Sequence, residues 1–400
     1  MAIKYSKKIV KVYAGILTVI ISIYRFIFKP VVNVPSKKTP LRIIILINRR
    51  QDVELLISIH DRARTREDLL VTFWLRKVFG DILPLLQEKG VVVDQLVSSE
   101  KLLLLSKELL QADAFLSTVE NSSSADKLPY ILTKLANAAG VSTYMMQHGF
   151  ETIGLSYRDK FHGSDVKFKS KTVLTWGAIE ELPSWVGADT LEKAIAVGCP
   201  QKLVTHTQNS IVNSGERHII GIFDNLHWHR YDKKYRLAFI QDLREISEHR
   251  KEFHFILKSH PVSVRKRSSE LADALKCMEN VDVVDLLGKE GAHLTTPWLL
   301  SQSLGVITTP STIALDGALA KIPVAVTRYG LDLNYYSPLT LLDNFEDWQR
   351  FLDQLTEKTK YNQLKLNVEL FLKHVLVPGD PANKILNLMV EQHVKKSPST

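Results

Sequence analysis

The heptapeptide LRIIILI, residues 41–47, is an aliphatic run of strand length interrupted only by Arg42. Such a run is typical of a strand buried on both faces of a sheet. Other short apolar runs follow it, and helical stretches are expected between several of them, at residues 69–86, 101–110 and 131–139. The apolar runs lie at residues 91–97, 114–119, 141–146, 173–176 and 194–197. Strands that alternate with helices predict a parallel α/β sheet covered on both faces.

The same pattern restarts after a polar segment rich in Gln, Asn, Ser and Gly, residues 205–215. Strands are expected at 218–223, 253–257, 281–284, 305–308 and 324–327, with helices at 233–249, 268–278 and 312–320. We therefore predict two Rossmann-like domains that face a cleft, an acceptor domain at 41–205 and a nucleotide-donor domain at 216–345, joined by a linker at 206–215. Residues 346–400 are expected to form a helical tail that packs back toward the first domain.

Composition narrows the class of protein. Hydrophobic residues at 45% and charged residues at 24% of 400 are typical of globular chains. Two cysteines, Cys199 and Cys277, are too few for a disulfide framework and lack the C-x-x-C spacing of zinc and redox sites. Since no uncharged apolar run reaches the ~18 residues of a spanning helix, a polytopic membrane protein is excluded.

The net charge of +9 resides at the N-terminus. Residues 1–50 hold 11 Lys and Arg and no acid, whereas the other 350 residues hold 41 basic and 43 acidic side chains. Residues 12–24 carry no charge, and such a helix would be about 20 Å long, too short for a ~30 Å hydrocarbon core.

We predict that residues 1–30 form a cationic amphipathic helix on an anionic membrane surface, followed by a linker at 31–40. This places the protein in the cytoplasm, peripheral on the inner face of the cell membrane. No nucleic-acid partner is expected. A signal peptide and a helix that simply packs on the first domain are the alternatives.

Ligands of open parallel sheets bind beyond the carboxyl ends of the strands, so the residues after each predicted strand matter most. The first such segment is Gln147-His148-Gly149. A histidine at a strand end, beside a glycine that permits close backbone approach, is a candidate general base for a hydroxyl nucleophile. The alternative is an ordinary turn in which the glycine adopts a positive φ.

Two further strand ends favour an anionic ligand. Lys258 and His260 precede Pro261 and offer N–H donors to a phosphate, unless this is only a strand-to-loop turn. Residues 308–312, TTPST, join a strand to a helix and combine hydroxyls with free backbone N–H groups, although Ser and Thr also cap helices without any ligand. One turn later, Asp316 is placed to accept hydrogen bonds from ribose hydroxyls.

A loop after the strand at 218–223 carries Asp224, His227, Trp228 and His229. The H-x-H spacing lacks accompanying metal ligands, so we expect a loop over the cleft, with a plain surface loop as the alternative. The sequence contains no G-x-G-x-x-G, no P-loop and no D-x-D, which favours a metal-independent reaction on a nucleotide without a dinucleotide cofactor.

Together these motifs resemble GT-B glycosyltransferases that make bacterial surface polymers. Residues 309–316, TPSTIALD, with Pro323, Tyr329 and Asp332 beyond them, are similar to the CDP-glycerol glycerophosphotransferase pattern T-D-Y-S-S-x-x-x-D. Capsule sialyl- and Kdo-transferases that use CMP-sugars have a similar His-Pro and Ser/Thr pair. The resemblance spans about residues 140–345, and it departs from the pattern at Gln147, Pro310 and Thr312.

The resemblance implies that His148 is the base on the acceptor hydroxyl, with Glu151 as a second catalytic candidate. It implies that the donor phosphate is bound by Lys258, His260, Ser311 and Thr312, and the ribose by Asp316. Further cleft contacts are expected at Gly149, Asp224, His229 and Thr309.

The implied activity is transfer of a glycosyl or polyol-phosphate group from a cytidine nucleotide, CMP- or CDP-linked, to a hydroxyl of a bacterial surface glycan or lipid-linked acceptor. No metal and no cofactor are expected. The alternatives are a sugar-nucleotide 2-epimerase of the same architecture, whose usual Ser-Gly-Gly loop is absent from residues 309–312, and a catalytically silent GT-B scaffold.

Overall fold

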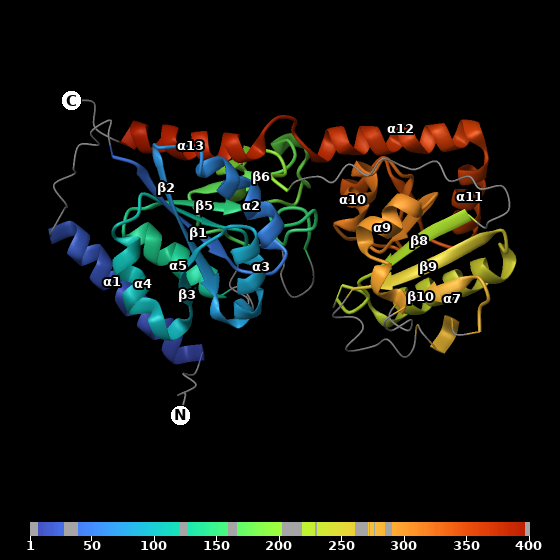
Figure 1. Cartoon of the computed structure of the whole chain (residues 1–400), viewed down its shortest axis with the longest axis horizontal. Coiled ribbons are helices and arrows are strands. Elements are labelled where there is room, and N and C mark those ends of the chain that lie inside the picture. Colours follow the sequence, from blue (N-terminus) through green and yellow to red (C-terminus); the bar gives the residue numbers. More distant parts are fainter. Residues whose placement is uncertain are drawn as a thin grey trace. The chain divides into compact units, whose positions relative to one another are not determined.

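Two parallel sheets organise the chain in the computed structural model, which describes residues 7–27, 39–120, 127–158, 166–201, 218–228, 230–260, 271, 273–275, 277–284 and 290–396 (Figure 1). Each sheet is the centre of one compact unit. The described residues of Met1–His148, Ser164–Lys202 and Leu376–Thr400 form unit 1, and those of Gly149–Gly163 and Leu203–Val375 form unit 2.

Unit 1 has a seven-stranded sheet in the order β3-β2-β1-β4-β5-β6-β7. Its buried faces are covered by α1, α4 and α5 on one side and by α2 and α13 on the other. The strands are β1 (Leu41–Ile47), β2 (Leu69–Arg76), β3 (Val93–Val97), β4 (Ala114–Ser117), β5 (Ser142–Met146), β6 (Thr172–Thr175) and β7 (Ala194–Ala196). The helices are α1 (Lys7–Ile27), α2 (Asp52–Ala63), α3 (Leu83–Glu88), α4 (Leu102–Leu109), α5 (Lys127–Ala138), α6 (Ala188–Leu191) and α13 (Pro381–Lys396).

Unit 2 has a six-stranded parallel sheet in the order β10-β9-β8-β11-β12-β13. A hydrophobic core lies between the sheet and helices α7 and α11, where Phe239 and Trp348 are fully buried. The strands are β8 (His218–Asp224), β9 (Phe253–Ser259), β10 (Val281–Val283), β11 (Gly305–Thr308), β12 (Val324–Thr327) and β13 (Thr340–Leu342). The helices are α7 (Lys233–His249), α9 (Thr296–Gln302), α10 (Ile313–Leu319), α11 (Phe345–Thr356) and α12 (Lys358–Val375).

These two units confirm the predicted pair of parallel-sheet α/β domains, but the first predicted helix is wrong at its start. Residues 69–76, LLVTFWLR, form β2 and pair in parallel with β1, and only 83–88 are α-helical. A short leucine-rich apolar run fits a buried strand as well as a helix, because its periodicity does not discriminate between them.

The division of the chain also differs from the expected boundaries. Residues 149–158 pack within unit 2 although they lie inside the predicted first domain. Helices α11 and α12 belong to unit 2, and only α13 returns to unit 1, where Gly198 meets the start of that helix. A Cβ on Gly198 would lie 2.8 Å from Pro381 Cγ and 2.9 Å from the Val377 carbonyl oxygen.

Helix α1 is part of the unit 1 core, because Ala14, Leu17 and Ile21 are buried against α4 and α5. The predicted linkers at 206–215 and most of 31–40 lie outside the described residues. Among the helices that are described, none combines the length and the apolar composition needed to cross a bilayer.

Candidate functional site

The point at which strand order reverses in unit 2 lies between β8 and β11, and ligands of doubly wound sheets bind at such a point. Hydrogen bonds of Asn225 and Thr309 connect the loop after β8 to the loop after β11. The Asn225 backbone N–H donates to Thr309 Oγ1 at 3.0 Å, and Thr309 Oγ1 donates to Asn225 Oδ1 at 2.7 Å. The Asn225 amide also donates to the Pro310 carbonyl at 3.0 Å. Since Thr309 is fully buried, it holds the loop in shape and leaves ligand contact to its neighbours.

The loop formed by residues 308–312, TTPST, is called the Ser/Thr loop. Two of its hydroxyls, on Ser311 and Thr312, are half-buried. Ser311 Oγ lies 3.0 Å from Thr308 Oγ1 and accepts from the Ile313 backbone N–H at 3.3 Å. Thr312 Oγ1 accepts from the Phe150 backbone N–H at 3.2 Å. Helix α10 has only seven residues, so its dipole adds little, and the capacity of this loop for a phosphate depends mainly on its hydroxyls and N–H groups.

Asp316 lies one turn further along α10 and is half-buried. Partial burial raises the pKa of its carboxyl to about 6, and no hydrogen bond or charge within the described part of the chain offsets that effect. A carboxylate that is partly removed from water, with no protein donor to compensate, is destabilised in its charged form. Such a group is well suited to accept hydrogen bonds from an incoming polyol, as predicted for a ribose.

The ends of β8 and β9 bring the two histidines of this edge together. The His227 and His260 rings stack with centroids 4.6 Å apart, and the His260 backbone N–H donates to the Asp224 carbonyl at 2.8 Å. Partial desolvation lowers the pKa of the His260 imidazole, which favours the neutral ring. Lys258 Nζ donates to the Leu294 carbonyl at 2.8 Å. His229 lies outside the described residues.

Asp224 is buried and shapes the turn after β8, because its Oδ1 accepts from the Leu226 backbone N–H at 3.1 Å.

Gly149 lies close to the Ser/Thr loop of unit 2. A Cβ at this position would lie 3.2 Å from Thr312 Oγ1, so a glycine lets the chain approach the Ser/Thr loop closely.

Residues 149–157 are built into unit 2 by aromatic contacts. The Phe150 ring is fully buried and stacks on Tyr335 with centroids 4.8 Å apart. It also makes edge contacts with Tyr336 at 5.0 Å and Phe371 at 5.3 Å. These contacts explain why the segment belongs to unit 2, although it lies between β5 and β6 of unit 1 in the chain.

Glu151 forms an ion pair with Arg230, and its side chain is only 3% exposed. Burial opposes the charge of the guanidinium, but the adjacent carboxylate outweighs that effect and raises the pKa of Arg230. The guanidinium also lies 4.8 Å above the Tyr157 ring. A carboxylate held in this way is suited to position the loop after His148 rather than to exchange protons with a substrate.

His148 itself belongs to unit 1, where it follows β5. Arg49 Nη1 lies 3.2 Å from its Nε2. A guanidinium has donors and no acceptor, so Nε2 accepts this hydrogen bond and carries a lone pair in this arrangement. The Arg49 guanidinium occupies this lone pair and opposes protonation of the ring, so His148 can act as a general base only when Arg49 turns away from Nε2.

The loop that carries Arg49 is shaped by Asp52, at the switch point between β1 and β4. Asp52 Oδ2 accepts from the Asn48 and Arg49 backbone N–H groups at 2.9 and 2.7 Å. Burial raises the pKa of Asp52 to about 6 even though a Thr118 hydroxyl and these N–H groups stabilise its charged form. Arg76 Nη1 donates to Asn48 Oδ1 at 3.1 Å, so a second guanidinium lies at this edge.

Sequence reasoning missed Arg49, Asp52, Asn225 and Arg230 as site residues. Arg49 and Asn225 each follow a predicted strand, so the rule that singled out His148 also applied to them. Arg230 carried no local signal, because its partner Glu151 is 79 positions away. Among the described residues, no group of three His, Cys, Asp or Glu side chains is arranged to hold a metal ion.

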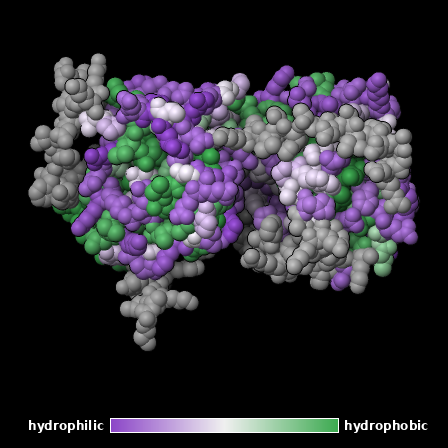
Figure 2. All heavy atoms as spheres, in the orientation of Figure 1, coloured by the Kyte–Doolittle hydropathy of each residue, from purple (hydrophilic) through white to green (hydrophobic). Residues whose placement is uncertain are grey.

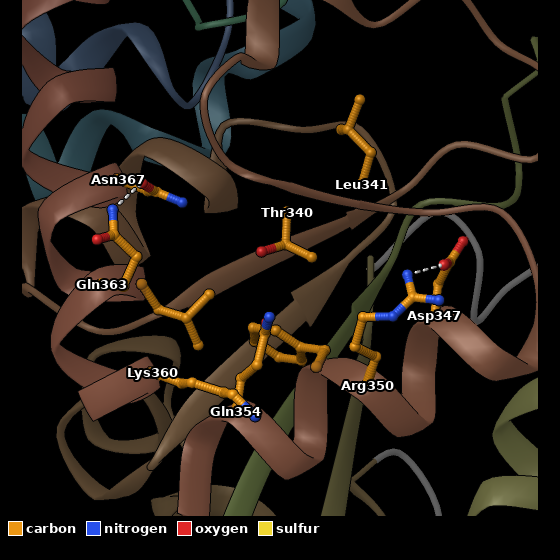
Figure 3. Close-up of a pocket in the computed structure, with 10 residues that line it drawn as sticks. Thr340, Leu341, Asp347, Arg350, Gln354, Lys360, Gln363 and Asn367 are labelled. Carbon is orange, nitrogen blue, oxygen red and sulfur yellow. Dashed lines mark hydrogen bonds and ion pairs between the residues drawn. The ribbon is translucent and has the colours of Figure 1, made fainter. Parts of the chain in front are cut away.

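A separate cavity of about 280 Å³ lies between β13, α11 and α12 (Figure 3). Its wall includes an Arg350–Asp347 ion pair at 2.7 Å and a Gln363–Asn367 hydrogen bond at 3.1 Å. Thr340, the first residue of β13, also lines it. β13 is the terminal strand of this sheet, and β12 separates it from β11, so the cavity is separate from the switch point where ligands of such sheets bind.

Comparison with known proteins shows the fold. No family model matches the chain, and no curated protein matches it by sequence. Among solved structures, an MnaA–UDP complex from S. aureus is similar with a TM-score of 0.61 and 12% identity, over 90% of this chain and 99% of that one. A putative UDP-N-acetylglucosamine 2-epimerase from Listeria monocytogenes has the same TM-score and coverage at 14% identity.

The wall teichoic acid polymerase TagF, in a structure of its H444N variant with CDPG, has a TM-score of 0.53 and 10% identity over 100% of both chains. These neighbours are GT-B enzymes, and the fold of this chain is that of GT-B enzymes.

Proposed function

We propose that the protein is a transferase that moves a glycosyl or polyol-phosphate group from a nucleotide-activated donor, CMP- or CDP-linked, to a hydroxyl of a surface glycan or lipid-linked acceptor. The observation that carries the proposal is Asp316, a desolvated carboxylate without an offsetting partner among the described residues, one turn beyond the Ser/Thr loop at the carboxyl edge of unit 2. A nucleotide has hydrogen-bonding partners for both groups. Its ribose hydroxyls can donate to the carboxylate, and its phosphate oxygens can accept from the loop.

The proposed step is a displacement on the donor. The acceptor oxygen forms a bond to the anomeric carbon of a CMP-sugar, or to the β-phosphorus of a CDP-polyol, while the bond to the cytidine phosphate breaks. Either route releases CMP. The proton of the acceptor hydroxyl passes to His148 Nε2 after Arg49 has turned away from that atom, and the N–H and hydroxyl donors of unit 2 stabilise the charge on the departing phosphate.

Individual roles follow from the contacts. His260 and Ser311 are assigned to the donor phosphate and Asp316 to the ribose. Lys258 and Thr312 contribute to the phosphate site while they also hold neighbouring backbone, through Leu294 and Phe150. Glu151, first considered catalytic, is assigned as a positioning residue through Arg230, and Arg49 is added beside the base.

The proposed setting is the cytoplasmic side of the cell membrane, with the chain peripheral on its inner face. The cationic N-terminal segment supports this setting, because residues 1–50 carry 11 basic and no acidic side chains. A lipid-linked acceptor would then be presented at the surface on which the enzyme resides.

A thermal-shift experiment tests the nucleotide site with CMP, CDP, UMP, UDP, GDP and ADP. A nucleotide at 100 times its Kd adds about 2.7 kcal/mol to the folded state, which raises the unfolding midpoint measurably. We expect CMP or CDP to raise it and the other nucleotides to have little effect. If no nucleotide raised the midpoint, the proposal would give way to a catalytically silent scaffold.

A sugar-nucleotide 2-epimerase is the second candidate, since UDP-GlcNAc 2-epimerases are among the structural neighbours and have higher TM-scores than TagF. The two activities differ in the bonds that they change. A 2-epimerase inverts C2 of the sugar, so incubation with UDP-GlcNAc in D₂O should introduce deuterium there without an acceptor. A transferase leaves C2 unlabelled and releases CMP from its own donor only when an acceptor is present.

A further inference from the structure

Helix α1 has apolar side chains on two opposite faces. Ala14, Leu17 and Ile21 lie in the unit 1 core. On the other side of the helix, at i, i+3 and i+4 spacing, the side chains of Val12, Ile16, Val19, Ile20 and Ile23 are each more than half exposed. A helix that buries one apolar stripe in the protein core and exposes a second one is typical of an element placed between that core and another apolar phase.

The exposed stripe continues onto the neighbouring helix. Leu103 and Leu104 of α4 are 54% and 48% exposed, and α1 and α4 are in contact. Apolar surface reaches the lower left of unit 1 in Figure 2, where Figure 1 places these two helices. We call the exposed residues of α1 together with Leu103 and Leu104 the α1–α4 face.

A cavity of about 230 Å³ opens between α1 and α5, beside the same helix. Thr18 and Tyr130 line it with hydroxyl groups, and Lys127 and Lys134 supply the cationic side chains. Of the side chains that the structure describes, no acidic one lines the cavity. The remaining lining residues are Ala14, Gly15 and Ile131. A cavity with apolar walls, two ammonium groups and the Tyr130 hydroxyl as a donor matches a phosphate headgroup that is attached to an acyl chain, whereas the Thr18 hydroxyl already donates to the Ala14 carbonyl at 2.7 Å.

We propose that the α1–α4 face docks on an anionic phospholipid membrane, and that the cavity between α1 and α5 binds a lipid phosphate headgroup. Charge complementarity selects this occupant, because the first 50 residues contain no acid and the two charged residues of the cavity are both lysines. The helix lies flat on the membrane, with its exposed face in the headgroup region. This inference deepens the proposed membrane setting and does not depend on the proposed chemistry.

Co-sedimentation of the full chain with vesicles tests the docking. One vesicle population is phosphatidylcholine alone and the other contains 30% phosphatidylglycerol. We expect binding to the anionic vesicles that weakens at 0.5 M salt. An Ile16→Asp/Val19→Asp variant should lose at least tenfold in affinity, whereas Leu237→Asp, at a 54% exposed position of α7, should bind like the parent.

The double variant Lys127→Gln/Lys134→Gln tests the headgroup site. Its control is Lys358→Gln/Lys373→Gln on α12, a double variant that removes the same amount of positive charge from another part of the protein. Only the first pair should lose the preference for anionic over neutral vesicles. Equal binding of the parent to both vesicle types, or unchanged binding by the Ile16→Asp/Val19→Asp variant, would overturn the proposal.

Two further measurements separate the alternatives. Light scattering without lipid should show the same mass for parent and face variant, and a dimer lost in the variant would assign the face to a second copy instead. The CMP-induced rise in unfolding midpoint should be the same in all variants, which shows that they are folded. A missing CMP response with intact vesicle binding would contradict the proposed chemistry and leave the docking in place.

Discussion

Replacing Asp316 by Asn should make the protein more stable and a poorer nucleotide binder. The folded state raises the pKa of this carboxyl from 3.8 to about 6 through burial. Each unit of pKa corresponds to about 1.4 kcal/mol, so ionised Asp316 destabilises unit 2 by up to about 3 kcal/mol at pH 7. Asparagine has nearly the same shape without the charge, and it should recover part of that free energy as a rise of several degrees in the unfolding midpoint.

The direction of the pKa shift determines how the destabilisation by Asp316 depends on pH. Because the folded pKa of Asp316 is raised, the penalty is fully present above about pH 7, shrinks as the pH falls through the folded pKa, and is lost near pH 3, where the carboxyl is mostly protonated in both states. The excess stability of Asp316→Asn should therefore be largest at pH 7.5, smaller at pH 5 and near zero at pH 3. Thermal unfolding of both proteins at these three pH values measures it.

Nucleotide affinity should change in the opposite direction. Hydrogen bonds to a charged group contribute about 1.5–3 kcal/mol, so the Asn variant should bind CMP about 10- to 100-fold more weakly at pH 7.5. Asp242→Asn is the matched control, since burial also raises the pKa of Asp242 to about 6 but its Oδ2 already accepts from the Tyr329 hydroxyl at 2.7 Å. A variant of Asp316 that was less stable than the parent at pH 7.5, or that bound CMP normally, would refute the assignment.

Other substitutions test the remaining parts of the site. His148→Ala should lower CMP release by 10²-fold or more while the CMP-induced midpoint shift is retained, and normal turnover would remove its role as base. Glu151→Ala should lower the free energy of unfolding by about 3–5 kcal/mol because it leaves Arg230 charged and buried. A double variant with Arg230→Met should be more stable than that single variant, and denaturant unfolding measures both free energies. Gly198→Ala should lower the unfolding midpoint since its φ is +97° and its Cβ would overlap Pro381, whereas Gly187→Ala, with no atom within 4 Å, should not.

Strand periodicity predicted most of the fold because buried parallel strands are short apolar runs with polar residues at their ends. Every strand expected in the second half is present, and α7 has the expected bounds. The error at 69–76 came from leucine, which is compatible with both kinds of element. The strand β13 was missed because its residues, TLL, contain leucine and no Val or Ile, unlike the equally short strands β7 and β10 that were predicted.

The candidate site was predictable only where chemistry follows a strand directly. That rule located His148, His260 and the Ser/Thr loop, because topology places all such residues at one edge of each sheet. The partners that define their roles come from distant positions, as with Glu151 and Arg230, and only folding reveals them. Asp316 was predictable in part. The motif predicted its position, but the sequence did not show that its carboxyl is partly removed from water.

The segment 149–158 bears on how such proteins can be recombined. Phe150 fills the unit 2 interior between Tyr335, Tyr336 and Phe371, and Glu151 neutralises a buried guanidinium of the same unit. A fragment cut at 203–375 would therefore expose a hole and an uncompensated charge, although it contains the whole second sheet. A chimera that exchanges unit 2 between proteins of this fold has to transplant this decapeptide with the later residues, as two separate insertions. Fusion points chosen by sequence order alone would separate unit 2 from part of its own core.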